Sequence, residues 1–232
     1  MDIIRKIHNF IHPPLGKVLM LHRVVEPIGF SPKPPYLEVA KDHLVEVVEA
    51  FQEVGAEFIG IDQVADRIRS KGNPYFVCVT FDDGYLDTYT YAYPVLKERQ
   101  IPFCVYMSRD FYQGTAKPHW NPWVEMMGEE QLLALASDPL CTIGAHTCSH
   151  PHLSQLNEED QRREIADCKA DLERLIGKPV RHFAYPYGDY NDITLRIVRE
   201  LGFETAVTTS GCQVRNDSKL LELDRVSFIQ KN

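Results

Sequence analysis

Short apolar segments alternate with segments of helical periodicity from one end of the chain to the other. This alternation predicts a parallel β-sheet or barrel that is wrapped in helices. The apolar segments predict strands at residues 17–21, 57–61, 75–81, 102–107, 141–145, 182–185, 204–208 and 226–229.

Helices are predicted between several of these strands. Asn157 is suited to cap a long helix whose first turn is acidic, and Gly177 and Pro179 are expected to end it. A further helical face is predicted by the spacing of Leu44, Val47, Val48, Phe51 and Val54.

Polar residues follow several of the predicted strands. Ligands of parallel α/β folds bind at the carboxyl ends of the strands, so a functional site is expected there. The residues in such positions are His22, Asp82, Asp83, His146, His150 and the segment "YPYG" at 185–188.

Asp82 and Asp83 are two adjacent carboxylates at the end of an apolar strand. Removing even one ion from water costs several kcal/mol unless another charge compensates it, so this pair predicts a cation. Two imidazoles and one carboxylate are a common ligand set for catalytic zinc, and His146 and His150 supply the imidazoles. Taken singly, a histidine beside a strand is usually structural, and an Asp-Gly pair is usually a turn.

Length and composition narrow the class of protein. The 232 residues, of which 44% are hydrophobic, fit a single domain over residues 1–232. A net charge of -8 argues against a nucleic-acid surface, because such binding requires an excess of Lys and Arg. A neutral or small-molecule partner is therefore expected, and the sequence does not indicate an oligomeric state.

Features that would direct the chain to a membrane or out of the cell are weak. No segment has the roughly 18 to 20 apolar residues that a transmembrane helix needs, and charged residues interrupt the amino-terminal segment where a signal peptide would be apolar. We therefore expect a cytoplasmic protein with reduced cysteines. A helical stripe is formed by Ile3, Ile4, Ile7 and Ile11; packing on the domain is favoured over peripheral contact with a membrane.

The chain resembles the polysaccharide deacetylases of the NodB-homology type, carbohydrate esterase family 4. The resemblance rests on three motifs in family order: "TFDDG" at 80–84, "HTCSH" at 146–150 and "RHFAYPYG" at 181–188. It implies a distorted (β/α) barrel of about seven strands. It also implies metal-dependent hydrolysis of acetyl groups on N-acetylated sugars, with one divalent ion as cofactor, zinc first and cobalt, nickel or iron as alternatives.

The same resemblance assigns roles to individual residues. Asp82 corresponds to the general base, and Arg181 to the arginine that orients it. The main-chain N–H of Tyr187 corresponds to a donor to the oxyanion. The metal ligands are expected to be Asp83, His146 and His150.

The late motifs that supply the general acid in most of the family are missing, because no histidine follows His182. "VLMLHRV" at 18–24 resembles the early element of a permuted subgroup in which an N-terminal histidine is the acid, which assigns that role to His22. "LDRVSF" at 223–228 resembles the end of the same subgroup, so Arg225 is a candidate supporting residue.

Other features stay open at this level. The segment "HWNPW", with Trp120 and Trp123, fits a sugar-stacking lip or a core cluster equally well. Cys148 is expected to fill space between the histidines rather than to bind metal, and His152 to be only a neighbour of the site. Two rival functions are an amidohydrolase of small cyclic amides on the same fold and a catalytically silent carbohydrate-binding domain.

Overall fold

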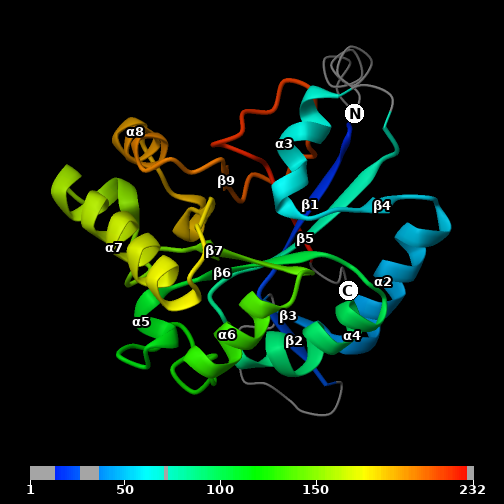
Figure 1. Cartoon of the computed structure of the whole chain (residues 1–232), viewed down its shortest axis with the longest axis horizontal. Coiled ribbons are helices and arrows are strands. Elements are labelled where there is room, and N and C mark those ends of the chain that lie inside the picture. Colours follow the sequence, from blue (N-terminus) through cyan, green and yellow to red (C-terminus); the bar gives the residue numbers. More distant parts are fainter. Residues whose placement is uncertain (1–13, 27–36, 71–72, 229–232) are drawn as a thin grey trace.

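A computed structural model describes residues 14–26, 37–70 and 73–228, and its centre is a sheet of eight strands (Figure 1). The main order is β10-β1-β5-β6-β7-β8-β9, and β4 also pairs with β5. All ladders in this sheet are parallel. The strands are β1 (Gly16–Leu21), β4 (Glu57–Phe58), β5 (Phe76–Phe81), β6 (Phe103–Met107), β7 (Cys141–Ala145), β8 (His182–Ala184), β9 (Thr205–Val207) and β10 (Val226–Ser227).

The predicted strands are confirmed, since each predicted segment overlaps one strand of this sheet. β7 has the predicted bounds, whereas β4 and β10 are shorter, and residue 229 lies outside the described residues. The sequence pattern missed a small parallel sheet of β2 (Arg23–Val25) and β3 (Glu38–Ala40). Three residues are too few to show a periodicity, which is why these strands escaped prediction.

Side chains of the central strands alternate between two apolar cores. In β5, Val77, Val79 and Phe81 belong to the larger core, and Phe76 and Cys78 belong to a smaller one. The smaller core also takes side chains from β1, β6, β8 and β9, so it fills the inside of a curved sheet. β5 and β6 are buried at every position, and strands covered on both faces are apolar throughout rather than alternating.

Helices surround this sheet, as Figure 1 shows. The seven-strand order with covering helices confirms the predicted distorted (β/α) barrel. The α-helices are α2 (Lys41–Glu53), α3 (Ile61–Arg69), α4 (Tyr93–Glu98), α5 (Arg109–Tyr112), α6 (Glu129–Ser137), α7 (Glu158–Ile176) and α8 (Asp192–Glu200). Short helical turns are η2 (Thr88–Ala92), η3 (Leu153–Gln155) and η4 (Pro186–Gly188).

The helix signals in the sequence are largely confirmed. The Asn157 side chain accepts a hydrogen bond of 2.9 Å from the Asp160 N–H at the start of α7, and Gly177 ends the helix with a φ of 66°. Leu44 and Val48 are the buried residues of α2. Val54 is wrong as a member of that buried face, because it follows the helix and is 77% exposed.

The segment before β10 connects the two edges of the barrel. β9 and β10 are the ends of the strand order, and Leu223 forms a parallel bridge to Val207. Two residues later, the Arg225 Nε donates a hydrogen bond of 2.9 Å to the Thr208 carbonyl. This path places Arg225 inside the barrel, where it is fully buried.

The apolar stripe predicted at residues 3–11 lies outside the described residues. No helix in the described part of the chain combines the length and the apolar character that crossing a membrane requires. The six cysteines are free thiols, and Cys212 is the exposed one.

Candidate active site at the carboxyl ends of the strands

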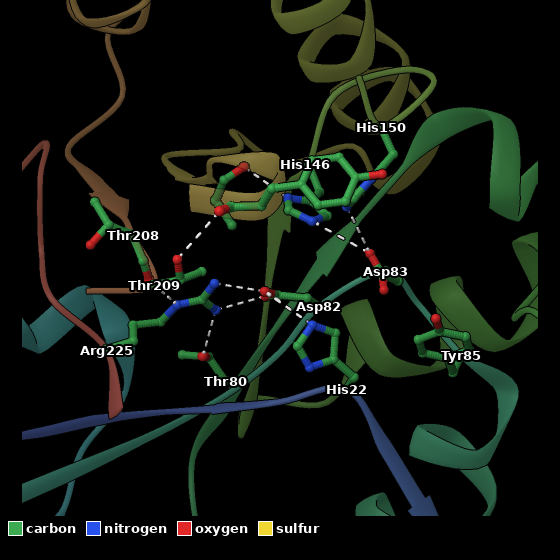
Figure 2. Close-up of polar contacts among 12 residues, drawn as sticks. His22, Thr80, Asp82, Asp83, Tyr85, His146, His150, Thr208, Thr209 and Arg225 are labelled. Atoms are coloured by element: carbon green, nitrogen blue, oxygen red, sulfur yellow. Dashed lines mark hydrogen bonds and ion pairs between the residues drawn. The ribbon is translucent and has the colours of Figure 1, made fainter. Parts of the chain in front are cut away.

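The predicted site residues gather at the carboxyl ends of neighbouring strands, as Figure 2 shows for most of them. Asp82 and Asp83 directly follow β5, His22 follows β1, and His146 follows β7. Tyr187 lies in the turn after β8. With His150 they line one cavity of about 340 Å³, and Arg181 is the one predicted site residue that does not.

The two adjacent aspartates point to different partners. Asp82 continues the alternation of side chains along β5, so it lies on the same face as Cys78 and Thr80. Cys78 belongs to the smaller core, and Thr80 accepts a hydrogen bond from Arg225. Asp83 has a φ of 72°, a left-handed conformation that breaks the alternation. Its carboxylate is therefore separated from that of Asp82 although the two residues are neighbours in the chain.

Asp83, His146 and His150 form a cluster with the geometry of a metal site. Their ligand atoms all lie within 4.8 Å of one another. The Asp83 Oδ1 is 3.4 Å from the His146 Nε2 and 3.3 Å from the His150 Nε2, yet this buried oxygen has no hydrogen-bond partner. A carboxylate and two imidazoles that converge in this way fit a divalent cation, which would satisfy the buried oxygen.

Contacts around the histidines prepare both rings for metal binding. The His146 Nδ1 lies 2.8 Å from the Ala184 carbonyl, so Nδ1–H donates to that oxygen and Nε2 is directed toward Asp83. Burial lowers the pKa of His150 to about 4, which keeps this imidazole neutral near pH 7. A metal ligand must be neutral imidazole, so His150 is in the form that binds. Burial lowers the pKa of His146, but the Asp83 and Asp82 carboxylates outweigh burial and raise it, so a cation bound at this site would have to displace a proton from that ring.

Asp82 is held by an arginine on the opposite side from the metal cluster. Arg225 makes two hydrogen bonds to the carboxylate, of 2.7 Å from Nη1 and 2.6 Å from Nη2 (Figure 2). Its guanidinium also donates to Thr80 and Thr208. Burial raises the pKa of Asp82, but the charge and hydrogen bonds of Arg225, together with the nearby His146 and His22, outweigh burial and lower that pKa below the ordinary 3.8. Asp82 is therefore ionised at neutral pH.

The structure contradicts the placement expected for Arg181. Its side chain is 55% exposed and its Nε lies 3.5 Å from Glu204. Arg181 precedes β8, so it is at the amino end of that strand, whereas Asp82 is at the carboxyl end of β5. Arg225 occupies the position beside Asp82 that the family resemblance assigned to Arg181.

His22 faces Asp82 across the cavity. The His22 Nε2 lies 4.0 Å from the Asp82 Oδ2, and its side chain is 19% exposed, so it can exchange protons with the solvent. Its ring and the metal cluster approach the cavity from different strands, as Figure 2 shows.

Aromatic rings form the wall beside the metal cluster. Trp120 donates a hydrogen bond of 3.0 Å to the Tyr85 hydroxyl, and its ring centroid lies 4.7 Å from that of His150. Tyr187 has a φ of 60°, and its ring centroid is 4.6 Å from His150. The sequence interpretation missed Tyr85, which directly follows "TFDDG" and is fully buried.

The weaker candidates separate in the structure. Trp120 lines the cavity, whereas Trp123 does not and is 89% exposed. Cys148 is buried with its Sγ 3.9 Å from the Arg163 carbonyl, so it fills space as expected. His152 stacks on Tyr187 with ring centroids 4.0 Å apart and is a neighbour of the site rather than a member of the metal cluster.

Comparison with known proteins assigns the family. A model of the polysaccharide deacetylase family matches residues 69–206, which is more than half of the chain. The chain belongs to the polysaccharide deacetylase family. The match covers Asp82, Asp83, His146 and His150, and leaves out His22 and Arg225.

Sequence relatives in this family are longer than the chain. A peptidoglycan-N-acetylglucosamine deacetylase of Bacillus cereus is 36% identical over 170 residues, which are 73% of this chain and 57% of the relative. A relative from Bacillus subtilis is 32% identical over 150 residues, 65% of this chain and 50% of the relative. The chain spans about half the length of these relatives.

Solved structures share the fold over nearly the whole chain. The Streptococcus pyogenes deacetylase PplD, solved in complex with acetate, has a TM-score of 0.81 at 24% identity and covers 93% of both chains. IcaB from Ammonifex degensii has a TM-score of 0.79 at 29% identity, over 92% of this chain and 91% of that one. These similarities agree with the barrel described above.

Proposed function

We propose that the protein is a metal-dependent hydrolase that removes acetyl groups from N-acetylated sugars of a polysaccharide or glycan precursor. The observation that carries the proposal is a single cavity that brings together a metal-ligand cluster and an ionised carboxylate held by a buried arginine. Membership of the polysaccharide deacetylase family supports the same reaction.

Asp83, His146 and His150 would hold the divalent ion, with zinc as the first expectation and cobalt, nickel or iron as alternatives. Such an ion polarises a carbonyl and lowers the pKa of a water from 15.7 to about 7. The residues around it keep its ligands in place, since the His146 Nδ1–H is fixed by the Ala184 carbonyl.

Asp82 is the general base of this proposal. Its carboxylate is ionised and cannot rotate freely, because Arg225 binds both oxygens. It accepts the proton of the attacking water as the water oxygen bonds to the acetyl carbon. The main-chain N–H of Tyr187 would donate to the oxygen that becomes negative in this step, which is the role that the family resemblance assigns to it.

His22 is the general acid of this proposal. The leaving amine needs a proton when the carbon–nitrogen bond breaks, and His22 faces the base across the cavity at 4.0 Å. Imidazole suits proton donation near neutral pH. Support for this role comes from the position of His22 at the end of β1, beside β5 in the sheet, and from its partial exposure.

Release of acetate from N-acetylated oligosaccharides, with and without a chelator, tests the function. A deacetylase releases acetate only without chelator. A hydrolase of cyclic amides opens a small cyclic amide and leaves the oligosaccharides intact, and a silent carbohydrate-binding domain binds them without turnover.

The metal site makes a first prediction. His146→Ala should bind divalent metal at least about tenfold more weakly. Removing a hydrogen-bond partner of a ligand typically lowers metal affinity by about tenfold or more, and removing the ligand itself should lower it at least as much. Metal analysis of protein purified without chelator measures this. His152→Ala, beside the cluster, is the matched control and should retain metal; equal metal in wild type and His146→Ala would rule out the assigned ligands.

The acid makes a second prediction. His22→Ala should keep its metal and lose acetate release from an N-acetyl sugar at least about tenfold more than from an aryl acetate, whose leaving group needs little protonation. His43→Ala, outside the cavity, should change neither rate. Equal losses on the two substrates would show that His22 is not the acid.

A further inference from the structure

The ring of His22 is not fixed by a hydrogen bond. It lines the catalytic cavity, and its Nε2 lies 4.0 Å from the Asp82 Oδ2, which is beyond hydrogen-bonding distance. No described residue forms a hydrogen bond with the imidazole. The direction in which His22 points therefore depends on how the backbone around it is held.

The backbone at His22 leaves the main sheet at the point where the strand pairing ends. The pairing of β1 with β5 stops at Leu21 and Phe81, and the Asp82 N–H then donates a hydrogen bond of 3.0 Å to the Leu21 carbonyl. His22 lies between β1 and β2, and β2 belongs to the small separate sheet. Pairing within the main sheet therefore does not fix the chain beyond Leu21.

Asp87 and Thr88 hold the chain at His22 and directly after it. The Thr88 Oγ1 donates a hydrogen bond of 3.2 Å to the His22 carbonyl. One oxygen of the Asp87 carboxylate accepts from the Arg23 Nε at 2.6 Å, and the other accepts from the Val24 N–H at 3.3 Å. Two neighbouring residues thus bind three consecutive residues of the segment that carries the proposed acid.

The contacts of Asp87 are sheltered from water. Its side chain is 12% exposed, and Thr88 is fully buried. Burial raises the pKa of Asp87 to about 6, although the Arg23 charge lowers it, so the carboxylate is ionised at pH 7. Its hydrogen bond from Arg23 is charge-assisted and therefore stronger than one between neutral groups. Arg23 also pairs with Glu38 in β3, which ties the small sheet to the same point.

Asp87 and Thr88 belong to the chain segment that carries other parts of the site. They follow Asp83 by four and five positions, and they begin η2, a π-helical turn of a kind that is rare and frequent at functional sites. Residues 82–88 therefore contain the proposed base, one proposed metal ligand and the two residues that hold the chain at His22. Hydrolysis of an amide needs base and acid at fixed positions around the bond that breaks.

We propose that Asp87 is a positioning residue of this reaction: by binding Arg23 and the Val24 N–H, it holds His22 so that the imidazole faces Asp82 across the cavity. Asp87 does not line that cavity, so it acts through His22 rather than on the substrate. Thr88 assists through the His22 carbonyl. The inference rests on the proposed function, in which His22 is the general acid.

Two substrates with different leaving groups test this role. Asp87→Ala is expected to lower kcat for an N-acetyl sugar about tenfold more than kcat for an aryl acetate, with KM changed by less than about twofold. Added to His22→Ala, it should cost less than about a further twofold, because no acid is left to position. Equal losses on the two substrates, or a loss that multiplies the loss of His22→Ala, would overturn the proposal.

Asp138→Ala is the matched control. Asp138 has a side chain that is 8% exposed, accepts a hydrogen bond of 3.0 Å from the Leu140 N–H and pairs with Lys97 at 2.9 Å. It precedes β7, at the end of the sheet away from the cavity. Its loss should leave the ratio of the two rates within about twofold of wild type. A change of that ratio as large as in Asp87→Ala would mean that general destabilisation explains the effect.

A more conservative variant covers the case in which Asp87→Ala does not fold. Asp87→Asn keeps the shape of the side chain and one oxygen for the Val24 N–H, but loses the charge that binds Arg23. It should fold and show a smaller loss with the same preference for the N-acetyl substrate. Wild-type rates on both substrates would overturn the proposal.

A crystal structure of the Asp87 variant separates this inference from the proposed reaction. The His22 ring is expected to move by more than about 1 Å, a displacement large enough to impair proton transfer, while Asp83, His146 and His150 stay in place. If wild type deacetylates the sugar and the variant neither moves His22 nor changes the rate ratio, the inference is overturned and the reaction stands. If wild type releases no acetate, the reaction is refuted; a displaced His22 then still supports Asp87 as the residue that holds it, and an unmoved one overturns that as well.

Discussion

The Asp82→Asn variant is expected to keep its metal and to lose a factor of about 10² to 10⁴ in acetate release. An amide has nearly the shape of the carboxylate but cannot accept the water's proton. The proposed metal ligands should be unaffected, because Asp83 has its own backbone conformation and its own partners, His146 and His150. Metal analysis and acetate assays on the same preparation measure both effects.

Asp189→Asn is the matched control for this prediction. Asp189 is an aspartate near the site that binds Ser154 and does not line the cavity, so the same change there should alter turnover by less than about twofold. Unchanged turnover in Asp82→Asn would mean that another group activates the water.

The Arg225→Met variant is expected to lower the free energy of unfolding by about 3 to 5 kcal/mol, because it leaves the Asp82 carboxylate buried without its partner. Urea unfolding measures this loss. Arg181→Met removes an exposed arginine instead and should stay within about 0.5 kcal/mol of wild type. Similar losses in both variants would contradict the assignment of Arg225 as the partner of the base.

A double variant shows whether the unpaired charge is the cause. Asp82→Asn combined with Arg225→Met removes both charges, so it should be more stable than Arg225→Met alone. If the double variant is no more stable, lost packing rather than the buried charge explains the effect, and the ion-pair account is wrong.

The pH dependence of stability and activity gives a second test of Arg225→Met. In the folded protein Arg225 lowers the pKa of Asp82 below 3.8, so this pair contributes stability above that pH and loses it as the pH falls through the lower folded pKa. In Arg225→Met, burial is unopposed by that charge and raises the pKa. The acidic limb of residual activity should therefore move to higher pH than in wild type.

Local patterns in the sequence were sufficient for most of the barrel. The apolar runs at β5, β6 and β7 are continuous because both faces of these strands are buried, and such runs can be recognised without a structure. Asn157 and Gly177 could be recognised as helix ends because each caps the backbone of its own helix, α7. β2 and β3 were missed because each has only three residues and depends on the other for its hydrogen bonds.

The metal cluster was also accessible from the sequence, because its residues lie at strand ends within recognisable motifs. The partner of Asp82 was accessible only in part, since Arg225 was a candidate supporting residue but the arginine beside Asp82 was expected to be Arg181. Arg181 stands in a family motif, but its position at the amino end of β8 directs it to Glu204. Trp120 and Trp123 look alike in "HWNPW", and only the fold shows that they line different cavities.

The sequence by itself determined which residue types stand at the ends of which strands, since strand and helix signals depend on neighbours in the chain. Only the tertiary structure decided which arginine holds Asp82. Arg225 is 143 positions from Asp82 and reaches it because β10 and β5 both flank β1 in the sheet. Pairing over such a separation depends on strand order and on the side chains that share the barrel interior, and no local pattern contains that information.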